Sequence, residues 1–566
     1  MAGVVLLANI ALCLLAGHAA AADWRAFKGL KKIRRPGPDY DYIEQPLLVE
    51  AADGNLVCVY ITNDKRLPRE GGWLFATRSA DCGRTWSRPV AITPAGKHAG
   101  YHSLYKNRGG RIYAVTCRLL VYSDDGGRIW SGVHSLPDMK VRNLDKREPA
   151  WSVVNACETG GHVLFPFARF DSFGKRRPAE SEVLFYCSKN IATAKDVKAL
   201  DWTTVPAAPL RHSDWKGKTL RCEEPALVSL GGKRLQVVAR TVNGYIPTWT
   251  SDDAGMTWSK PGKLRFSDKR VIKHPKAYVG FWRASNGNYL LWHHFNSTPD
   301  GGGVTNRRNP VWISGGRLVK GQIRWSQPEI LFHHPDPRIG ISYAWFTEHK
   351  GKYLMAAGNK HEIRIGKIPA GFLDGLWNQH ANRKAASRGK VLDLVSPPGS
   401  APLKAIPNLA SGGFSVDFRV RFNSLEDNQL VLNYRGNGKP HRGWAVRTGN
   451  HGRVRLEMRD DEDEYVEWYC DPGVLKRGKD HHIAFIVDGK ADIISVMVDG
   501  NLQDGGRAAT HGWVQFSHGM DALDGGQTRL KIGSTLKGKL KQVRVYDRAL
   551  STSEMIGNYR AGQGPR

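Results

Sequence analysis

An eight-residue motif occurs three times in the first 370 residues, at residues 79–86, 123–130 and 251–258. Its pattern is Ser-x-Asp-x-Gly-x-Thr-Trp, and Ile129 in place of Thr is the one departure. The Asp can accept hydrogen bonds from backbone N–H groups of its own turn, the Gly permits positive φ, and the Trp can pack between neighbouring sheets. The motif therefore predicts the same turn in several similar sheets.

A second repeat underlies the first, and it consists of an extended segment, a Gly turn and a second strand. The turns fall at six glycines about 50 to 70 residues apart: Gly54, Gly110, Gly161, Gly232, Gly287 and Gly351. This spacing suits four-stranded blades with loop insertions. We therefore predict a six-bladed β-propeller over residues 23–370, closed by a strand before Asp39 that joins blade six.

The chain continues well beyond this repeat. Its 566 residues exceed what one hydrophobic core normally organises, and its 62 Gly and 18 Trp suit many short strands and tight turns. The pattern stops after Pro369, residues 371–399 have the composition of a linker, and residues 414–422 then alternate apolar and polar side chains as a half-exposed strand does. The predicted fold class is all-β, with the propeller followed by a β-sandwich jelly roll over residues 400–566.

The first 22 residues predict a signal peptide. Residues 4–15 are apolar but too few to span a bilayer, and the alanines at 19–22 offer cleavage sites near Ala21 or Ala22. We therefore expect a secreted or periplasmic protein with no membrane span.

The net charge indicates what kind of partner the protein binds, and the cysteine content indicates whether disulfides or a zinc site are expected. The formal net charge of +30 favours an anionic partner, and without a nucleic-acid-binding module we expect an acidic glycan or polysaccharide and no nucleic acid. The seven cysteines after residue 22 are too sparse for a disulfide framework, so we expect mostly buried free thiols, with a bridge among Cys157, Cys187 and Cys222 left open. No Cys or His spacing predicts a zinc site.

Three arginines stand at the same distance after a turn glycine. Arg118, Arg169 and Arg240 each follow their glycine by eight residues, after apolar strands. Burying such charges without anions is costly, so we predict that they face one central pocket and bind a carboxylate or sulfate. The alternative is that each arginine pairs with a local Asp or Glu.

The repeated turn resembles the Asp-box of sialidases, and other positions extend the resemblance. Glu224 and Arg240 have the interval of that family's inward Glu and an Arg of its carboxylate-binding triad. Arg307 is similar to the last triad Arg, and Tyr343 to the nucleophilic Tyr. The resemblance implies a glycoside hydrolase in which Glu224 takes the proton of Tyr343.

Two positions depart from the family pattern. Glu44 stands where the family has a triad Arg, which would repel a carboxylate in the usual pose. The general-acid Asp has only Asp64 and Glu70 as candidates. We therefore expect weak cleavage of simple α-sialosides and a preference for a uronate or sulfated sugar.

His102 supports a second chemistry, because it stands to Arg118 as Glu224 stands to Arg240. A lyase acting on a uronic acid needs a base for the C5 proton and a cation for the carboxylate. His102 or Tyr343, with the three arginines, could supply both. The sequence thus leaves three functions open: a hydrolase, a polysaccharide lyase and a non-catalytic glycan-binding propeller.

The second domain resembles laminin-G-like jelly rolls in its closing segment, residues 538–551. We expect it to fold independently and to hold the protein near a glycan or cell surface. No cofactor is expected, although the acidic run at residues 460–464 could contribute to a structural calcium site rather than a solvated loop.

Overall fold

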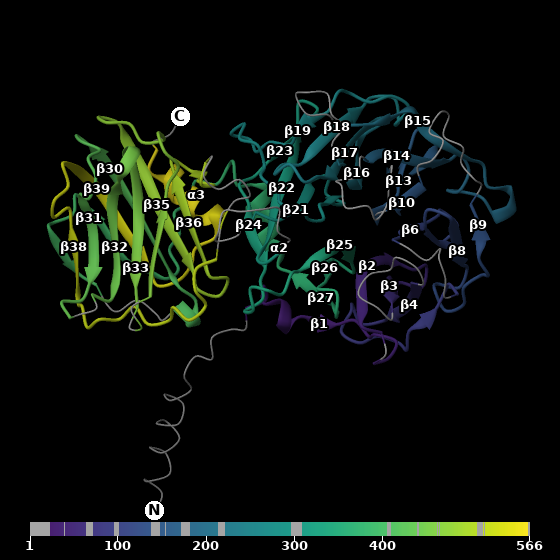
Figure 1. The fold of residues 1–566 in the computed structure, drawn as a ribbon, viewed down its shortest axis with the longest axis horizontal. Coiled ribbons are helices and arrows are strands. Elements are labelled where there is room, and N and C mark those ends of the chain that lie inside the picture. Colours follow the sequence, from purple (N-terminus) through teal and green to yellow (C-terminus); the bar gives the residue numbers. More distant parts are fainter. Residues whose placement is uncertain are drawn as a thin grey trace, which may run out of the picture.

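The computed structural model describes residues 23–38, 40–63, 72–94, 101–136, 148–152, 154–170, 181–212, 221–295, 308–403, 409–438, 441–460, 462, 464–506, 513 and 515–563. Within these ranges the chain is almost entirely β, with one ring of small sheets and one pair of larger sheets (Figure 1). The predicted signal peptide, Asp64, Glu70 and Arg307 lie outside the described residues.

Six sheets succeed one another along the first part of the chain and form the blades of the propeller. Blade one contains β2 (Tyr42–Glu50), β3 (Leu56–Asn63), β4 (Trp73–Ser79) and β5 (Val90–Ala91). Blade two contains β6 (Ser103–Lys106), β7 (Ile112–Val115), β8 (Leu119–Ser123), β9 (His134–Ser135) and β11 (Val154–Asn155). Blade three contains β10 (Glu148–Ser152), β12 (Cys157–Thr159), β13 (His162–Phe170), β14 (Ser181–Ser188) and β15 (Trp202–Leu210), with the 3₁₀ turn η2 (Val197–Ala199).

The remaining three blades complete the ring. Blade four contains β16 (Glu223–Gly231), β17 (Arg234–Arg240), β18 (Pro247–Ser251) and β19 (Gly262–Lys263). Blade five contains β20 (Gly280–Arg283), β21 (Tyr289–His293), β22 (Val311–Val319), β23 (Gln322–Trp325) and β24 (Glu329–Phe332). Blade six contains β25 (Ser342–His349), β26 (Lys352–Gly358) and β27 (Ile363–Ile368), and β1 (Lys31–Lys32) after η1 (Phe27–Gly29) pairs with β27. The predicted fold class and the predicted closing strand are both confirmed.

The three copies of the repeated motif form the same hydrogen-bonded turn. In the first copy, Asp81 accepts from the Thr85 backbone N–H at 2.8 Å and from its hydroxyl at 2.7 Å. The Trp86 indole N–H donates to the Gly83 carbonyl oxygen at 3.1 Å. In the third copy Gly255 has φ +91°, and a Cβ there would lie 2.6 Å from Leu164 of the neighbouring blade. Glycine is therefore required both for the turn and for blade-to-blade packing.

All six predicted turn glycines have positive φ, from 57° at Gly232 to 89° at Gly110. They connect the first two strands of five blades, and in blade three Gly161 connects β12 and β13. The seven cysteines in the described residues are free, and five of them are buried, so the bridge that was left open does not form.

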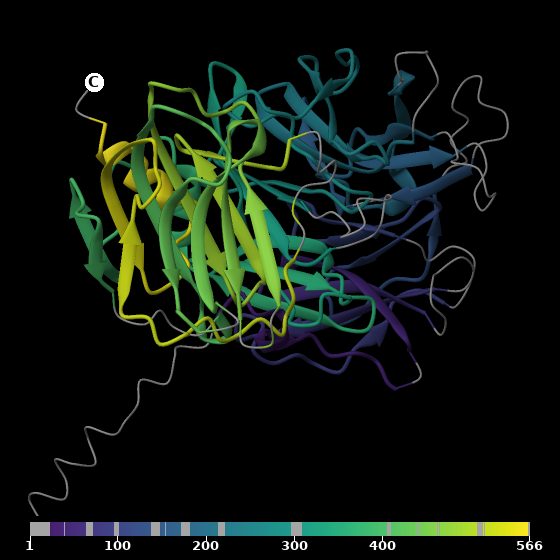
Figure 2. The same ribbon diagram turned by 60° about the vertical axis from the view of Figure 1, so that its left-hand side comes forward.

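Two six-stranded sheets form the sandwich (Figure 2). The first contains β28 (Lys390–Val395), β39 (Gly538–Tyr546), β30 (Phe414–Phe422), β35 (Asp480–Asp488), β36 (Ile493–Val498) and β37 (Asn501–Leu502). The second contains β29 (Ser400–Pro402), β38 (Arg529–Ile532), β31 (Leu430–Arg435), β32 (Gly443–Gly449), β33 (Arg453–Arg459) and β34 (Tyr465–Tyr469), and η3 (Leu409–Ser411), η4 (Asn450–Gly452) and α3 (Thr552–Ala561) complete the domain. The segment predicted as a linker contains α2 (Ala370–Trp377) and strand β28.

The sandwich packs tightly on blades four and five. The Trp513 ring stacks on Phe295 at 4.7 Å between centroids and lies 5.3 Å from that of Trp312. The Glu329 carboxylate accepts from the backbone N–H groups of Thr552 and Ser553 at 2.8 and 2.7 Å, and so caps α3. A residue of the propeller thus satisfies the first turn of the last helix of the chain.

Candidate active site

Three inner strands carry the same backbone irregularity, and it positions the candidate residues. In blades one, four and six the first hairpin has a register shift near the start of its inner strand. Gln45, Glu224 and Tyr343 have φ of 57°, 51° and 49° there, a region that non-Gly residues rarely adopt. Such bulges redirect consecutive side chains and are common beside active sites.

The bulges of blades four and six bring two predicted catalytic residues into contact. The Tyr343 hydroxyl donates to Glu224 Oε1 at 2.6 Å, and Arg240 Nη1 donates to the same oxygen at 2.5 Å. All three side chains are buried. Tyr343, Glu224 and Arg240 therefore form one connected group, although Tyr343 and Glu224 are 119 residues apart in sequence.

The charges around this pair fix its protonation. Burial raises the pKa of Glu224, but Arg240, the Tyr343 hydroxyl and Arg308 outweigh burial and leave it below its usual value. Burial and the Glu224 charge raise the pKa of Tyr343 well above 10. The pair consequently holds an ionised carboxylate beside a protonated phenol, which is the arrangement needed for transfer of the phenolic proton to Glu224.

Arg308 lies at this site and was not predicted. Its guanidinium carbon is 5.7 Å from the centre of the Tyr343 ring, and Nη1 donates to the Ser342 hydroxyl at 3.0 Å. Its Nε and Glu224 Oε2 are buried without hydrogen-bond partners among the described residues. The sequence signal was the adjacent pair Arg307-Arg308, of which the family resemblance indicated Arg307.

Three further phenols surround Tyr343. Its ring centre lies 5.5 Å from that of Tyr101 and 5.2 Å from that of Tyr278. The Tyr101 hydroxyl lies 3.5 Å from that of Tyr42, which in turn donates to Glu44. A row of phenols thus runs from Glu44 to Tyr343 and on to Glu224.

Glu44 differs from Glu224 in its protonation. It is only 1 % exposed, and burial raises its pKa to about 7, although the Tyr42 hydroxyl, Arg308 and Lys360 oppose this. Two carboxyl groups in one site with pKa values driven apart are the usual arrangement of a base and an acid. Glu44 is therefore the described carboxyl of this site that can donate a proton near neutrality.

The other predicted site residues lie elsewhere or have local partners. Arg169 pairs with Glu182 across its own hairpin, with Nε 2.9 Å from Oε1, and Arg118 lies in the turn before β8. The buried His102 ring contacts the Val59 carbonyl oxygen through Nε2 at 3.2 Å. Burial lowers the pKa of His102 to about 3, so this ring is a weak base.

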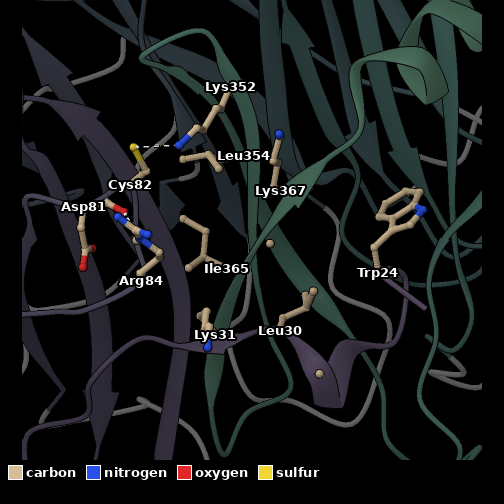
Figure 3. Close-up of a pocket in the computed structure, with 13 residues that line it drawn as sticks. Trp24, Leu30, Lys31, Asp81, Cys82, Arg84, Lys352, Leu354, Ile365 and Lys367 are labelled. Atoms are coloured by element: carbon tan, nitrogen blue, oxygen red, sulfur yellow. Dashed lines mark hydrogen bonds between the residues drawn. The ribbon is translucent and has the colours of Figure 1, made fainter. Parts of the chain in front are cut away.

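A separate pocket of about 350 Å³ lies where blade six meets the first repeated turn (Figure 3). Lys31, Arg84, Lys352 and Lys367 line it, together with Cys82 at 3.7 Å from Lys352 Nζ. None of the candidate catalytic residues lines this pocket.

The acidic run of the sandwich has a local structural role in its described part. Asp460 Oδ1 accepts from the backbone N–H groups of Glu462 and Glu464 at 3.0 and 2.9 Å, which holds the turn. Asp461 and Asp463 lie outside the described residues. Within the described ranges, no three His, Cys, Asp or Glu side chains are grouped so as to hold a metal ion.

Comparison with known proteins identifies the second domain. Residues 399–555 match the model of the concanavalin A-like lectin/glucanases superfamily, which confirms the predicted laminin-G-like domain. No curated protein sequence matches the chain significantly.

Several solved structures resemble the chain at low identity. They include a Trypanosoma rangeli sialidase in complex with sialic acid (13 % identity, TM-score 0.44, 95 % of this chain and 97 % of that one). A Hadza microbial sialidase (17 %, 0.43, 60 % and 68 %) and a Dyadobacter fermentans protein of unknown function (14 %, 0.43, 60 % and 96 %) are also similar. Such low values carry no information about the reaction, so the propeller assignment depends on the six sheets themselves.

Proposed function

We propose that the chain is a secreted carbohydrate-active enzyme, a glycoside hydrolase that removes a terminal sugar from an acidic glycan. The main support is the contact of 2.6 Å between the Tyr343 hydroxyl and Glu224, beside the guanidinium groups of Arg240 and Arg308. A Tyr becomes a nucleophile when a neighbouring carboxylate accepts its proton, and two cations beside it suit an anionic sugar.

In this proposal the reaction has two steps, and Glu224 and Glu44 each act in both. The Tyr343 oxygen attacks the anomeric carbon while Glu224 takes the phenolic proton, the glycosidic bond breaks, and the leaving oxygen receives a proton from Glu44. Water then attacks the sugar and gives its proton to Glu44, the bond from sugar to Tyr343 breaks, and Glu224 returns the proton to Tyr343.

A uronate lyase is the second candidate function, and it depends on Tyr343. The lyase would need Tyr343 as the base for the C5 proton, with Arg240 and Arg308 neutralising the carboxylate. The weak basicity of His102 makes that residue a poorer base than the sequence suggests.

A secreted location and a glycan partner belong to the same proposal. The apolar segment at residues 4–15 and the net charge of +30 support them. None of the helices in the described ranges has both the length and the hydrophobicity required to cross a bilayer.

The test compares wild type with Tyr343→Phe and Glu224→Gln on aryl glycosides and on uronate polysaccharides. We expect each variant to lose about 10²- to 10⁴-fold in kcat, as loss of a catalytic proton acceptor does. Saturated reducing sugar indicates a hydrolase, and the ultraviolet absorbance of an unsaturated uronate indicates a lyase. The control is Tyr289→Phe, which removes another buried hydroxyl, bonded to the Ser229 carbonyl oxygen at 3.1 Å in blades four and five. Wild-type activity in both test variants would show that Tyr343 and Glu224 do not perform the reaction. No product from any substrate with the wild-type protein would leave only a glycan-binding propeller.

A further inference from the structure

The two sheets of the sandwich differ in how they meet the propeller. On the outer face of the first sheet, β35 and β36 present apolar side chains to the propeller, where Ile486 and Met497 share a buried cluster with Phe281 and Tyr289 of blade five. In the second sheet, strands β31 and β38 are drawn well away from the propeller (Figure 1).

Strand β33 shows why the outer face of the second sheet is charged. Val454, Leu456 and Met458 belong to the sandwich core, so the alternating residues point outward. These outward residues include Arg455 and Glu457. The outer face of the second sheet, hereafter the arginine face, carries seven basic and two acidic side chains: Arg435, Arg447, Arg453, Arg455, Arg459, Arg529 and Lys531, with Glu457 and Glu467.

Three of these guanidinium groups converge on one buried carboxylate. Arg455 Nε lies 2.6 Å from Glu457 Oε1, Arg447 Nε lies 3.3 Å from Oε2, and Arg435 also pairs with Oε2. Arg455 also lies 3.3 Å from Asp427 and 3.7 Å from Glu467, so neighbouring carboxylates match its charge. Arg435 and Arg447 share the other oxygen of Glu457, and because each guanidinium has five N–H donors, these two retain donors for a further anion.

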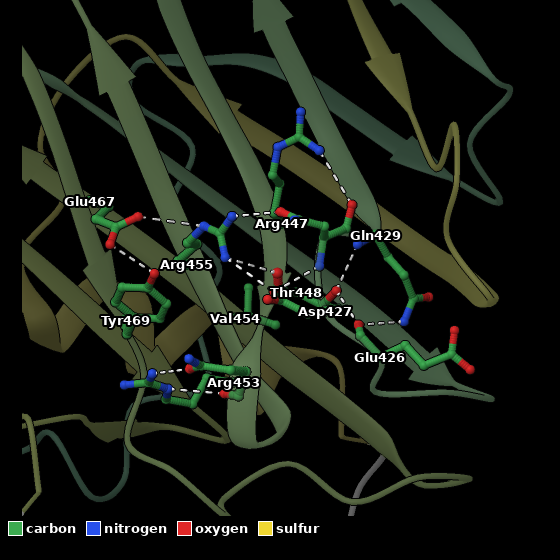
Figure 4. A network of polar contacts seen from close by, with 12 residues as sticks. Glu426, Asp427, Gln429, Arg447, Thr448, Arg453, Val454, Arg455, Glu467 and Tyr469 are labelled. Carbon is green, nitrogen blue, oxygen red and sulfur yellow. Dashed lines mark hydrogen bonds and ion pairs between the residues drawn. The ribbon is translucent and has the colours of Figure 1, made fainter.

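Two tyrosines beside this group are fixed in place by a second carboxylate. Glu467 accepts from the hydroxyl of Tyr469 at 2.8 Å (Figure 4) and from that of Tyr465 at 3.0 Å. Gly449 makes room for one of them, because a Cβ there would lie 2.8 Å from the Tyr469 ring. Tyr465 is 46 % exposed, so part of its ring is free to contact a ligand.

Arginines also lie over both tyrosine rings. The guanidinium carbon of Arg453 is 4.3 Å from the centre of Tyr469, and that of Arg459 is 5.2 Å from the centre of Tyr465. The face therefore presents guanidinium groups, phenol rings and carboxylate oxygens that are already oriented by one another. Binding to such a preorganised surface costs little side-chain entropy.

We propose that the arginine face is a binding site for a polysaccharide that carries carboxylate or sulfate groups. Guanidinium forks bind both anions in bidentate fashion, and tyrosine rings pack against the apolar faces of sugar rings. The site lies on the opposite sheet from the propeller, and its test does not depend on the propeller being an enzyme.

The carboxylates favour a sugar over a nucleic acid. Glu467 is half exposed and has acceptor capacity beyond the two tyrosine hydroxyls, and Glu457 keeps a negative charge among the arginines. A polyhydroxylated chain offers hydroxyl donors for these oxygens. A phosphodiester backbone offers acceptors instead and would meet repulsion at both carboxylates.

The experiment measures binding of the full-length protein by titration calorimetry at two salt concentrations. The probes are heparin, polygalacturonate, neutral dextran and a single-stranded oligothymidylate. We expect heparin or polygalacturonate to bind, with an affinity that falls as salt rises, and dextran and the oligonucleotide to bind at least tenfold more weakly. Arg447→Gln combined with Arg453→Gln should weaken binding about tenfold or more, because a hydrogen bond to a charged group contributes about 1.5–3 kcal/mol.

The matched control removes the same charge elsewhere on the sandwich. Arg421→Gln with Lys541→Gln does so at Asp480, on the other sheet, and should change the affinity less than twofold. Circular dichroism of both double variants checks that they are folded, and Tyr465→Ala provides a second, exposed probe of the face. Equal weakening by the two double variants, equal affinity for the oligonucleotide, or no binding of either acidic polysaccharide would overturn the proposal.

Discussion

Replacing Glu44 by Gln should stabilise the protein at alkaline pH and leave its stability unchanged at acidic pH. The substitution keeps the shape of the side chain but removes the charge that the buried site disfavours. In the folded protein the pKa of Glu44 is about 7, above the usual 4.5, and burial is the main cause. Between these two pH values the folded state binds more protons than the unfolded state, so stability falls as pH rises through this window and the loss is complete above about pH 7.

The size of the effect follows from the same two pKa values. At about 1.4 kcal/mol for each pKa unit, the ionised carboxylate costs the folded protein about 3 kcal/mol. Tyr42 can donate its hydroxyl hydrogen to the Gln carbonyl oxygen as it does to Glu44, so the substitution keeps that contact. At pH 4 the Glu44 carboxyl is protonated in the folded protein and mostly protonated in the unfolded chain, so the two proteins should unfold alike.

The assay is denaturant unfolding of wild type and Glu44→Gln at pH 4, 5, 6, 7 and 8. The difference in the free energy of unfolding should grow from near zero at pH 4 toward about 3 kcal/mol at pH 8. Glu462→Gln, at an exposed carboxylate of the sandwich, is the control and should follow wild type at every pH. Parallel curves for wild type and Glu44→Gln would refute the assignment of Glu44 as a carboxyl that is protonated near neutrality.

Two further outcomes test the specificity and the assembly of the molecule. A fluorogenic α-sialoside should be cleaved weakly or not at all. Glu44 offers no positive charge for the carboxylate of the sialoside, and it becomes negative above about pH 7. Efficient turnover by wild type would contradict this prediction. Trp513→Ala should lower the free energy of unfolding by about 3–5 kcal/mol, because it leaves a cavity beside Phe295 and Trp312. Proteolysis between the domains should become faster in this variant. Unchanged thermal unfolding would mean that the docking does not depend on this ring.

The fold was predictable because the residues that define it act locally. A Gly that must adopt positive φ, or an Asp that holds its own turn, needs only its neighbours in sequence, and the six turn glycines and three turns are found where the sequence predicts them. The start of the sandwich was less visible. Strand β28 lies before residue 400, and its alternating pattern is too short to predict a strand from the sequence. In the structure it pairs with β39.

The site residues could be predicted only in blades where the bulged residue lies eight residues before the turn glycine. Counting eight residues back from a turn glycine reaches Glu224 and Tyr343, which both occupy bulges with positive φ. In blade two the same count reaches His102, but β6 pairs without a register shift. A change of one residue reverses the direction of a side chain, so Tyr101, and not His102, contacts Tyr343.

The predicted cluster of Arg118, Arg169 and Arg240 shows what spacing alone can and cannot indicate. Equal distance from a turn places residues at the same height on their strands, but the hairpin also brings each one opposite a residue of the partner strand. Arg169 is thereby paired with Glu182, and Arg240 with Glu223 and Glu224. Of these two arginines, Arg240 pairs with a carboxylate that also accepts from a tyrosine hydroxyl, which ties it to the candidate chemistry. The second cation of the site, Arg308, comes from the segment before β22 and contacts Tyr343 across blades five and six, a relation that no repeat within the sequence encodes.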